Sequence, residues 1–260
     1  LTFVHPYDDP DVVAGQGTIG LEMLRAVPDL DAVIVSVGGG GLVAGMATAL
    51  KAVRPEVEVI GVQARRFPGV YNAVRHQHLP VGQASLAEGI AVGTPGRLLL
   101  ALIERHVDDI VLVEEGEIEQ AILTLLEVEK TLVEGAGAAG LAALLHDPAR
   151  FTGRKVGLVL CGGNIDLLLL AAIIERGMVR AGRLARIRVG ARDAPGSLAR
   201  IAAIVAEAGG NVEEVHHQRA FTLLEAQNVE IELVVQARGG DHVQAVLQSL
   251  AAAGFPATTA

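Results

Sequence analysis

The sequence predicts an α/β fold built on a parallel sheet, followed by a smaller α+β domain of the ferredoxin-like type. Up to about residue 178, short apolar segments alternate with helix-length segments, which is typical of a parallel sheet covered by helices on both faces. From residue 184 the expected order becomes β-α-β-β-α-β, as in a ferredoxin-like domain. A length of 260 residues also suits two domains. We therefore expect domains at 1–178 and 184–260, joined by a linker at 179–183.

Composition excludes several other classes of protein. The net charge is −9, so a general nucleic-acid surface is not expected. The longest apolar run, residues 167–174, is much shorter than the ~20 residues that a membrane helix needs. A single cysteine excludes an internal disulfide framework and suits a reducing compartment. We expect a soluble, cytoplasmic protein that does not bind membranes.

The central element is a strand, a glycine turn and a helix. Residues 32–37 are an apolar, β-branched run, Gly38 to Gly41 form the turn, and an Ala/Leu/Met-rich helix ends at Arg54-Pro55. The unpaired N–H groups of a first helical turn attract an anion, and a Cβ in the turn would hold a phosphate away from them. The alternative is a turn whose glycines only allow the helix to pack on the strand.

Two other phosphate sites fit the turn poorly. A Walker A loop needs a lysine, and none lies between Gly38 and Ala49. A dinucleotide site can be drawn through Gly39, Gly41 and Ala44, but it needs an acid at the end of the next strand, where this chain has Gln63. A compact phosphate monoester is the remaining ligand.

The other elements of the first domain follow from apolar periodicity, caps and breakers. Asp9 and Pro10 are a typical N-cap and first helical residue, and Glu115 begins a helix with acids in its first turn. The expected strands are Thr2 to His5, Val57 to Val62, Asp109 to Val113 and Lys155 to Cys161. The expected helices are Asp9 to Val27, Phe67 to His78 (helix or loop), Thr94 to His106, Glu115 to Lys130, a helix that follows a break at Gly135–Gly137 and ends at His146, and Ile165 to Arg176.

The topology of a parallel sheet brings two of these turns together. Gly38 to Gly41 and Cys161 to Gly163 both follow the carboxyl ends of expected strands, so they should lie on the same rim, where such sheets bind ligands.

In the second domain we expect strands at Leu184 to Arg192, Asn211 to Gln218, Ala226 to Ala237 and from Phe255 onward, with helices at Ser197 to Ala208 and Asp241 to Ala253.

With these residues in view, the chain resembles the threonine dehydratases, pyridoxal-phosphate (PLP) enzymes of the tryptophan-synthase-β-like fold. Its second domain resembles an ACT domain, a module that senses small molecules. The matching stretches are residues 5–18, Val37 to Leu42, Leu86 to Val92, Val133 to Ala138, Leu160 to Asp166 and, for the ACT domain, Asp193 to Leu198.

The resemblance implies roles for particular residues. Gly38, Gly39, Gly40, Gly41 and Leu42 would hold the PLP phosphate, and Cys161 would contact the pyridine nitrogen. A thiol there leaves the ring less electron-withdrawing than a carboxylate would, which favours prompt β-elimination. From the residue alone, the favoured interpretation of Cys161 is a small buried hydrophobe at a strand end. Glu134 would lie near the ring, or else be a solvated acid at a helix end.

No metal site is expected. His76 and His78 have no accompanying carboxylate or cysteine, and Gln63 to Gly69, where some relatives bind a divalent cation, has no acid. A PLP lyase also needs a lysine that anchors the cofactor and moves the α-proton. Lys51, Lys130 and Lys155 do not start a helix in a Ser-x-Lys context. The family places that lysine before the first matching stretch, so we expect it upstream of residue 1 and expect no catalytic residue within this chain.

The resemblance predicts deamination of L-threonine to 2-oxobutanoate and ammonia, with L-serine as a second substrate, by a homo-oligomer under ACT-domain control. The chain on its own should be inactive. The alternative is an amino-acid-sensing regulatory protein with an inactive scaffold domain. In either case Asp193, Gly196 and Asn211 are the candidate effector-binding residues.

Overall fold

The structure is a computed structural model that describes residues 4–218 and 227–260. The expected strand at Thr2 to His5 lies partly outside these residues, and Val4 and His5 are not in a strand. The first residue of the expected strand at Ala226 to Ala237 also lies outside them. The chain divides into two compact units, residues 1–167 and 168–260, which are described separately.

The first unit alternates helices and strands as the sequence predicts. Its elements are α1 (Pro10–Ala26), β1 (Ala32–Ser36), α2 (Gly41–Val53), β2 (Glu58–Ala64), α3 (Gly69–Arg75), the 3₁₀ turn η1 (Glu88–Ile90), α4 (Arg97–His106), β3 (Asp109–Val113), α5 (Glu115–Thr124), the π-helical turn η2 (Leu125–Glu129), α6 (Gly135–His146), α7 (Pro148–Phe151) and β4 (Val156–Leu158).

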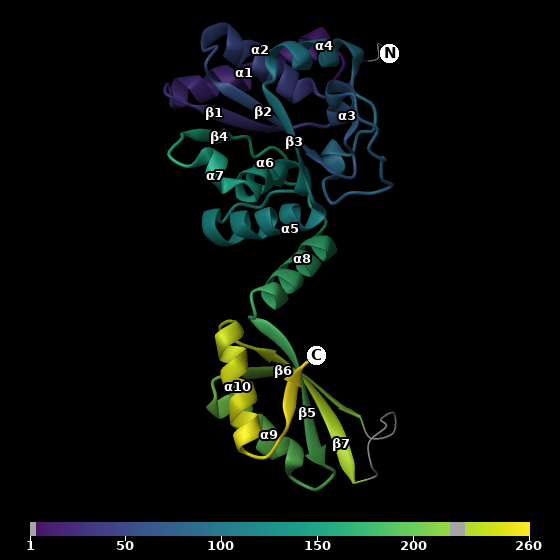
Figure 1. Cartoon of the computed structure of the whole chain (residues 1–260), viewed down its shortest axis with the longest axis vertical. Helices are drawn as coiled ribbons and strands as arrows, with labels where there is room; N and C mark the ends of the chain where they lie inside the picture. Colours follow the sequence, from purple (N-terminus) through teal and green to yellow (C-terminus); the bar gives the residue numbers. More distant parts are fainter. Residues whose placement is uncertain (1–3, 219–226) are drawn as a thin grey trace. The chain divides into compact units, whose positions relative to one another are not determined.

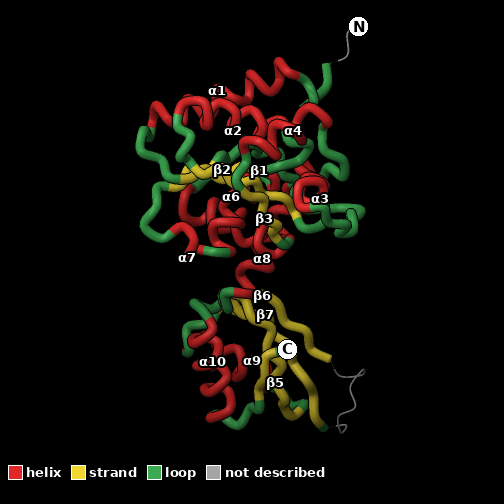
Figure 2. Tube along the Cα trace, turned by 45° about the horizontal axis from the view of Figure 1, so that its top comes forward, coloured by secondary structure: helices red, strands yellow, loops and turns green. Residues whose placement is uncertain are grey.

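The strands of the first unit form a parallel sheet with helices on both faces. In the described residues the strand order is β3-β2-β1-β4, and all neighbouring strands are parallel. Helices α1, α2 and α4 lie on one face, and α5 and α6 lie on the other (Figures 1 and 2). Every residue of the central strand β1 is buried, which explains its continuous apolar sequence. The predicted fold class of this unit is confirmed.

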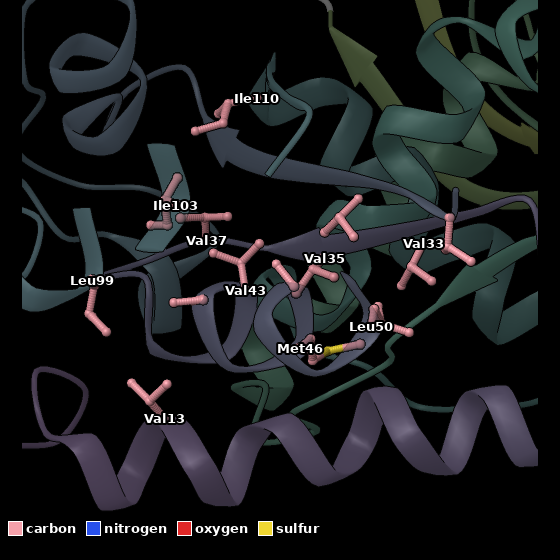
Figure 3. Close-up of a cluster of buried hydrophobic side chains, with 14 of the residues drawn as sticks. Val13, Val33, Val35, Val37, Val43, Met46, Leu50, Leu99, Ile103 and Ile110 are labelled. Carbon is pink, nitrogen blue, oxygen red and sulfur yellow. The ribbon is translucent and has the colours of Figure 1, made fainter. Parts of the chain in front are cut away.

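The core on the α1/α2 face is built from alternate residues of β1 and from the apolar stripe of α2. Figure 3 shows Val35 of β1 beside Val43 and Met46 of α2, with Val13 of α1 beyond them. Helices α1 and α2 approach closely because α2 has a glycine at the crossing. A Cβ at Gly45 would overlap the carbonyl oxygen of Val13. The α1/α2 pair thereby holds the helix that follows the glycine turn in a fixed position on the sheet.

Several element boundaries differ from the expectation, most clearly those of β4, α6 and α5. Strand β4 ends at Leu158 rather than at Cys161, because the chain leaves the sheet to approach α6, where the Glu134 N–H donates to the Gly162 carbonyl oxygen at 3.1 Å. Helix α6 begins at Gly135 instead of after a break, and glycine is needed at this position because a Cβ would lie 2.5 Å from the Leu86 carbonyl oxygen. The helix expected up to Lys130 changes from α5 to η2 at Leu125.

The second unit has the predicted ferredoxin-like order. Its elements are α8 (Leu167–Arg180, assigned from residue 168 onward), β5 (Leu184–Arg192), α9 (Ser197–Glu207), β6 (Asn211–Gln218), β7 (Asn228–Gln236), α10 (Gly240–Ala252) and β8 (Ala257–Thr259). Among described residues the antiparallel strand order is β6-β7-β5-β8, and α9 and α10 cover one face (Figure 1). By its contacts, α8 belongs to this second unit. The sequence predicts instead that residues up to 178 belong to the first domain.

Within the described ranges, no helix is both long enough and apolar enough to span a bilayer.

Candidate cofactor site

The carboxyl ends of β1 and β4 lie at the same edge of the sheet. The two strands are parallel neighbours, with Ala32 opposite Val156. The turn at Gly38–Gly41 follows β1, and Cys161 follows β4. Helix α6 begins at this edge too, because the buried Ser36 hydroxyl at the end of β1 donates to the Ala136 carbonyl oxygen at 2.6 Å. The structure therefore brings the starts of α2 and α6 and the turn after β4 to one rim.

The glycine turn presents backbone N–H groups for which the structure shows no acceptor among the residues it describes. Gly39 and Gly40 are buried and Gly38 is half-buried, yet no acceptor for their N–H groups is found in the part of the chain that the structure describes. Gly41 is the first residue of α2, so its N–H has no partner within the helix, and the half-buried Leu42 follows it. Buried N–H groups are nearly always hydrogen-bonded, so this turn fits an anion such as a phosphate.

The glycines themselves are required by packing. A Cβ at Gly39 would overlap the ring of Tyr7, and a Cβ at Gly38 would lie 3.1 Å from Ile90 Cα in η1. Gly40 has a φ of 107°, and a Cβ there would lie 2.8 Å from Ile103 Cδ1 of α4. The packing explanation weighed from the sequence therefore accounts for the glycines, while the unpaired N–H groups are what support an anion site.

Glu134 lies between the turn after β4 and η1. Its Oε2 accepts from the Asn164 N–H at 3.2 Å, and a Cβ at Gly162 would overlap its carboxylate. On the other side, a Cβ at Gly89 would lie 3.2 Å from Glu134 Oε1, and the Gly89 carbonyl oxygen lies beside Gly38. The half-buried carboxylate is thus hydrogen-bonded to the turn after β4 and lies near Gly89 of η1.

Cys161 is half-buried beside Glu134. Burial raises the pKa of the Cys161 thiol, and the negative charge of Glu134 raises this pKa further, although a backbone hydrogen bond opposes both. The thiol is therefore neutral near pH 7, since the ordinary pKa is already 9.0. A neutral S–H is a weak hydrogen-bond partner.

The three lysines are engaged away from the glycine turn. Lys51, in the last turn of α2, donates to the Val57 carbonyl oxygen at 2.8 Å and pairs with Asp108 at 2.7 Å. Lys130 donates to the Glu127 carbonyl oxygen at 2.6 Å. Lys155 precedes β4, at the opposite edge of the sheet from the rim, and pairs with an aspartate there.

Gln63 occupies the position where a dinucleotide site would need an acid. Its side chain is fully buried, Nε2 donates to the Val37 carbonyl oxygen at 3.2 Å, and Oε1 accepts from the Tyr71 N–H at 2.8 Å. Both ends of the amide serve the fold immediately before the glycine turn. The dinucleotide alternative has no support here. Among the described residues there is also no group of three metal-ligating side chains.

Sequence reasoning did not single out Tyr7, Asp8 or η1 as parts of the site. The stretches that carry the resemblance contain all of them, but periodicity and motif spacing do not show that they surround the glycine turn. Their contacts join positions far apart in the chain, such as Tyr7 and Gly39, and these depend on tertiary packing.

The second unit has a hollow of about 420 Å³ at the start of α9. Asp193 and Gly196 line it, together with Leu198 and His217. Asn211 is not among its lining residues, and its amide donates to Gln236 Oε1 at 3.3 Å. The structure therefore brings two of the three candidate effector residues together and leaves the third outside the hollow.

Several known proteins are similar to this chain. Residues 1–162 match the family described as "Pyridoxal-phosphate dependent enzyme". The L-threonine ammonia-lyase of Thermotoga maritima is 44% identical over 255 residues, which cover 97% of this chain and 63% of that protein. The catabolic L-threonine dehydratase TdcB of Escherichia coli K12 is 43% identical over 175 residues, covering 66% of this chain and 53% of that protein.

Solved structures agree with these matches. The processed form of threonine deaminase isoform 2 from Solanum lycopersicum is 30% identical, with a TM-score of 0.64, over 69% of this chain and 50% of that one. The serine racemase of Dictyostelium discoideum is 34% identical, with a TM-score of 0.58, over 63% of this chain and 54% of that one.

The matched residues include every part of the rim from the glycine turn to Cys161, although the chain spans only 63% of the length of the Thermotoga relative. The unpaired N–H groups of the turn fit a phosphate, and the neutral thiol fits a place beside a pyridine nitrogen. The match covers more than half of the chain. The chain therefore belongs to the family of pyridoxal-phosphate dependent enzymes.

Proposed function

We propose that this chain is the cofactor-binding part of an L-threonine ammonia-lyase, which converts L-threonine to 2-oxobutanoate and ammonia. The observation that carries the proposal is the 44% identity, over 97% of this chain, to a protein named L-threonine ammonia-lyase. L-serine, which has the same β-hydroxyl, would give pyruvate and ammonia by the same chemistry.

The residues of the rim have distinct tasks in this proposal. When bound, PLP supplies an electron sink for the charge left by loss of the α-proton. The N–H groups of Gly38 to Gly41 and Leu42 hold the phosphate. Cys161 offers the ring nitrogen a neutral thiol instead of a carboxylate, which favours prompt departure of the β-hydroxyl. Glu134 keeps the turn after β4 in register with η1 and so holds the two halves of the site together.

The proton-transferring lysine is proposed to lie outside residues 1–260, because all three lysines of this chain have other partners. Pyridoxal phosphate added to the chain should therefore bind without a covalent link to Lys51, Lys130 or Lys155. Borohydride reduction followed by peptide mass analysis checks this, and a specific pyridoxyl adduct on one of these lysines would overturn it.

The test of the activity uses the full-length protein that contains this chain. Supplied with PLP and L-threonine, it should release equal amounts of ammonia and 2-oxobutanoate, measured with a lactate dehydrogenase coupled assay. The same protein with Cys161→Asp should lose activity while retaining PLP, because a carboxylate would hold the ring nitrogen protonated. A full-length protein that binds PLP and releases no 2-oxo acid from L-threonine or L-serine would refute the proposal.

A second candidate function is amino-acid sensing by the ACT-like second unit, which favours a homo-oligomer because ACT domains commonly pair. The observation that supports it is the hollow lined by Asp193 and Gly196. Equilibrium dialysis of the whole chain with isoleucine, valine and threonine should show binding that Asp193→Ala abolishes and Asn211→Ala leaves unchanged. Equal effects of the two substitutions would argue against the hollow as the site.

A further inference from the structure

Residues His5 to Asp9, here called the N-terminal strap, fold into a tight turn against the glycine turn. His5 Nδ1 accepts hydrogen bonds from the N–H groups of Tyr7, at 3.3 Å, and Asp8, at 2.8 Å. The His5 and Tyr7 rings meet edge to face, with centroids 4.5 Å apart and an interplanar angle of 84°. The Asp9 side chain then caps α1, where Oδ1 accepts from the N–H of Asp11 at 2.8 Å. The strap is therefore fixed at both of its ends.

The strap places the Tyr7 side chain directly on the glycine turn. The ring atoms Cγ, Cδ2 and Cε2 lie where a Cβ of Gly39 would stand. A Cβ at Gly41 would lie 3.1 Å from Tyr7 Cβ and 3.2 Å from the Tyr7 carbonyl oxygen. On the other sides, Ile103 and Ile90 approach Gly40 and Gly38. The four glycines are thus enclosed by large side chains or backbone, and Tyr7 contacts two of them.

Asp8 connects the strap to α4 and, through α4, to the turn again. Its carboxylate accepts from the N–H groups of Arg97 and Leu98, each at 3.1 Å, at the start of α4. A Cβ at Gly96 would lie 2.5 Å from Asp8 Oδ1. The Gly96 N–H donates to the Gly39 carbonyl oxygen at 3.2 Å. The N-terminal strap, the start of α4 and the glycine turn therefore each contact the other two around Gly39.

We propose that Tyr7 is a positioning residue for a phosphate-bearing cofactor. Its ring holds Gly39 and Gly41 in the one backbone conformation that directs the N–H groups of the turn to the phosphate. Four consecutive glycines have many conformations of similar energy, so an anion would otherwise have to order them on binding. This inference rests on the proposed function, because it presumes that the turn holds the phosphate. It adds the residue that pre-forms the cradle.

The fraction of molecules with a pre-formed cradle sets the apparent affinity for the phosphate. If the turn without the ring adopts the competent conformation about one tenth of the time, the dissociation constant rises roughly 10-fold. Tyr7→Phe keeps the ring atoms that contact Gly39 and should bind as tightly as the wild type. Tyr7→Ala removes them and should show the loss.

The second tyrosine provides a matched control. Tyr71 packs against the same hydrophobic core as Tyr7 but contacts Gln63 through its backbone. Tyr71→Ala should lower the free energy of unfolding without changing the affinity for phosphate. A role of Tyr7 that is merely structural would give the same result for both alanine variants.

The experiment uses the whole chain and pyridoxamine 5′-phosphate, which has no aldehyde and so cannot form adducts with the lysines. Glycine-selective ¹⁵N labelling allows the amide shifts of the turn to be followed during the titration. In the wild type the Gly39 and Gly41 amides should shift on binding, with the same affinity for Tyr7→Phe and Tyr71→Ala and roughly 10-fold weaker affinity for Tyr7→Ala.

The outcomes separate the two proposals. If the wild-type chain does not bind the probe at these amides, both the phosphate site and the role of Tyr7 are overturned. Wild-type binding that Tyr7→Ala leaves unchanged, or that Tyr71→Ala weakens equally, overturns the positioning role alone.

Discussion

Substitution of Gln63 by glutamate introduces the acid that a dinucleotide site would need. The new carboxylate would be buried, and the residues that the structure describes offer no partner for its negative charge. The Gln63 amide is fully buried, and its N–H donates to the Val37 carbonyl oxygen. The introduced carboxylate would face that oxygen, so a hydrogen bond is lost and two buried oxygens are left unpaired. We expect a loss of about 2–5 kcal/mol in the free energy of unfolding at pH 8.

This cost should depend on pH in a defined direction. Burial raises the folded-state pKa of the introduced carboxyl above its unfolded value of about 4.3. The protonated form can still donate to Val37, so the difference from the wild type should be small below about pH 4 and grow by up to ~1.4 kcal/mol per pH unit as pH rises toward the folded-state pKa. Urea unfolding followed by circular dichroism at several pH values measures it.

Gln63→Met is the control for volume and burial. It leaves the Val37 carbonyl oxygen and the Tyr71 N–H unpaired but carries no titratable group, so its cost should be independent of pH. A glutamate variant as stable as the wild type at pH 8, or one whose deficit does not vary with pH, would refute the account of Gln63.

Further predictions concern stability and the single thiol. Burial raises the pKa of Asp109, but Arg150 and other donors hold it below its ordinary value. Arg150→Met should therefore lower the free energy of unfolding by about 1–3 kcal/mol at pH 7. This loss should shrink as pH falls through the folded-state pKa of Asp109. Gly45→Ala should destabilise the first unit by about 1–3 kcal/mol, whereas Gly15→Ala, with nothing within 4 Å of its Cβ, should stabilise it by about 0.5–1 kcal/mol in urea unfolding. The rate of Cys161 alkylation by iodoacetamide should still be rising with pH at pH 9.0, because it follows the thiolate fraction, and a plateau reached below pH 9.0 would contradict the raised pKa.

The sequence could predict the elements whose cause is local. The β-branched run of β1, the caps of α1 and the alternation of β7 each determine their own element, and the structure has them. It could also place the turns after β1 and β4 on one rim, because strand direction in a parallel sheet follows from the length of the connections.

The sequence-based predictions were wrong where the local structure depends on contacts with residues far away in the chain. Gly135 and Gly137 are expected from the sequence to interrupt a helix, but both lie in α6, and glycine is needed there because Leu86 and Cys161 approach too closely for a Cβ. The same limit applies to the site. No periodicity shows that Tyr7 lies on Gly39, since that contact exists only when α1 is packed on α2.

A crystal structure of this chain with PLP tests the central claim most directly. It should show the phosphate within hydrogen-bonding distance of the Gly38–Gly41 amides and the pyridine nitrogen beside Cys161 Sγ in the same molecule. A cofactor bound elsewhere, or a phosphate in the turn with its ring directed away from Cys161, would contradict the account.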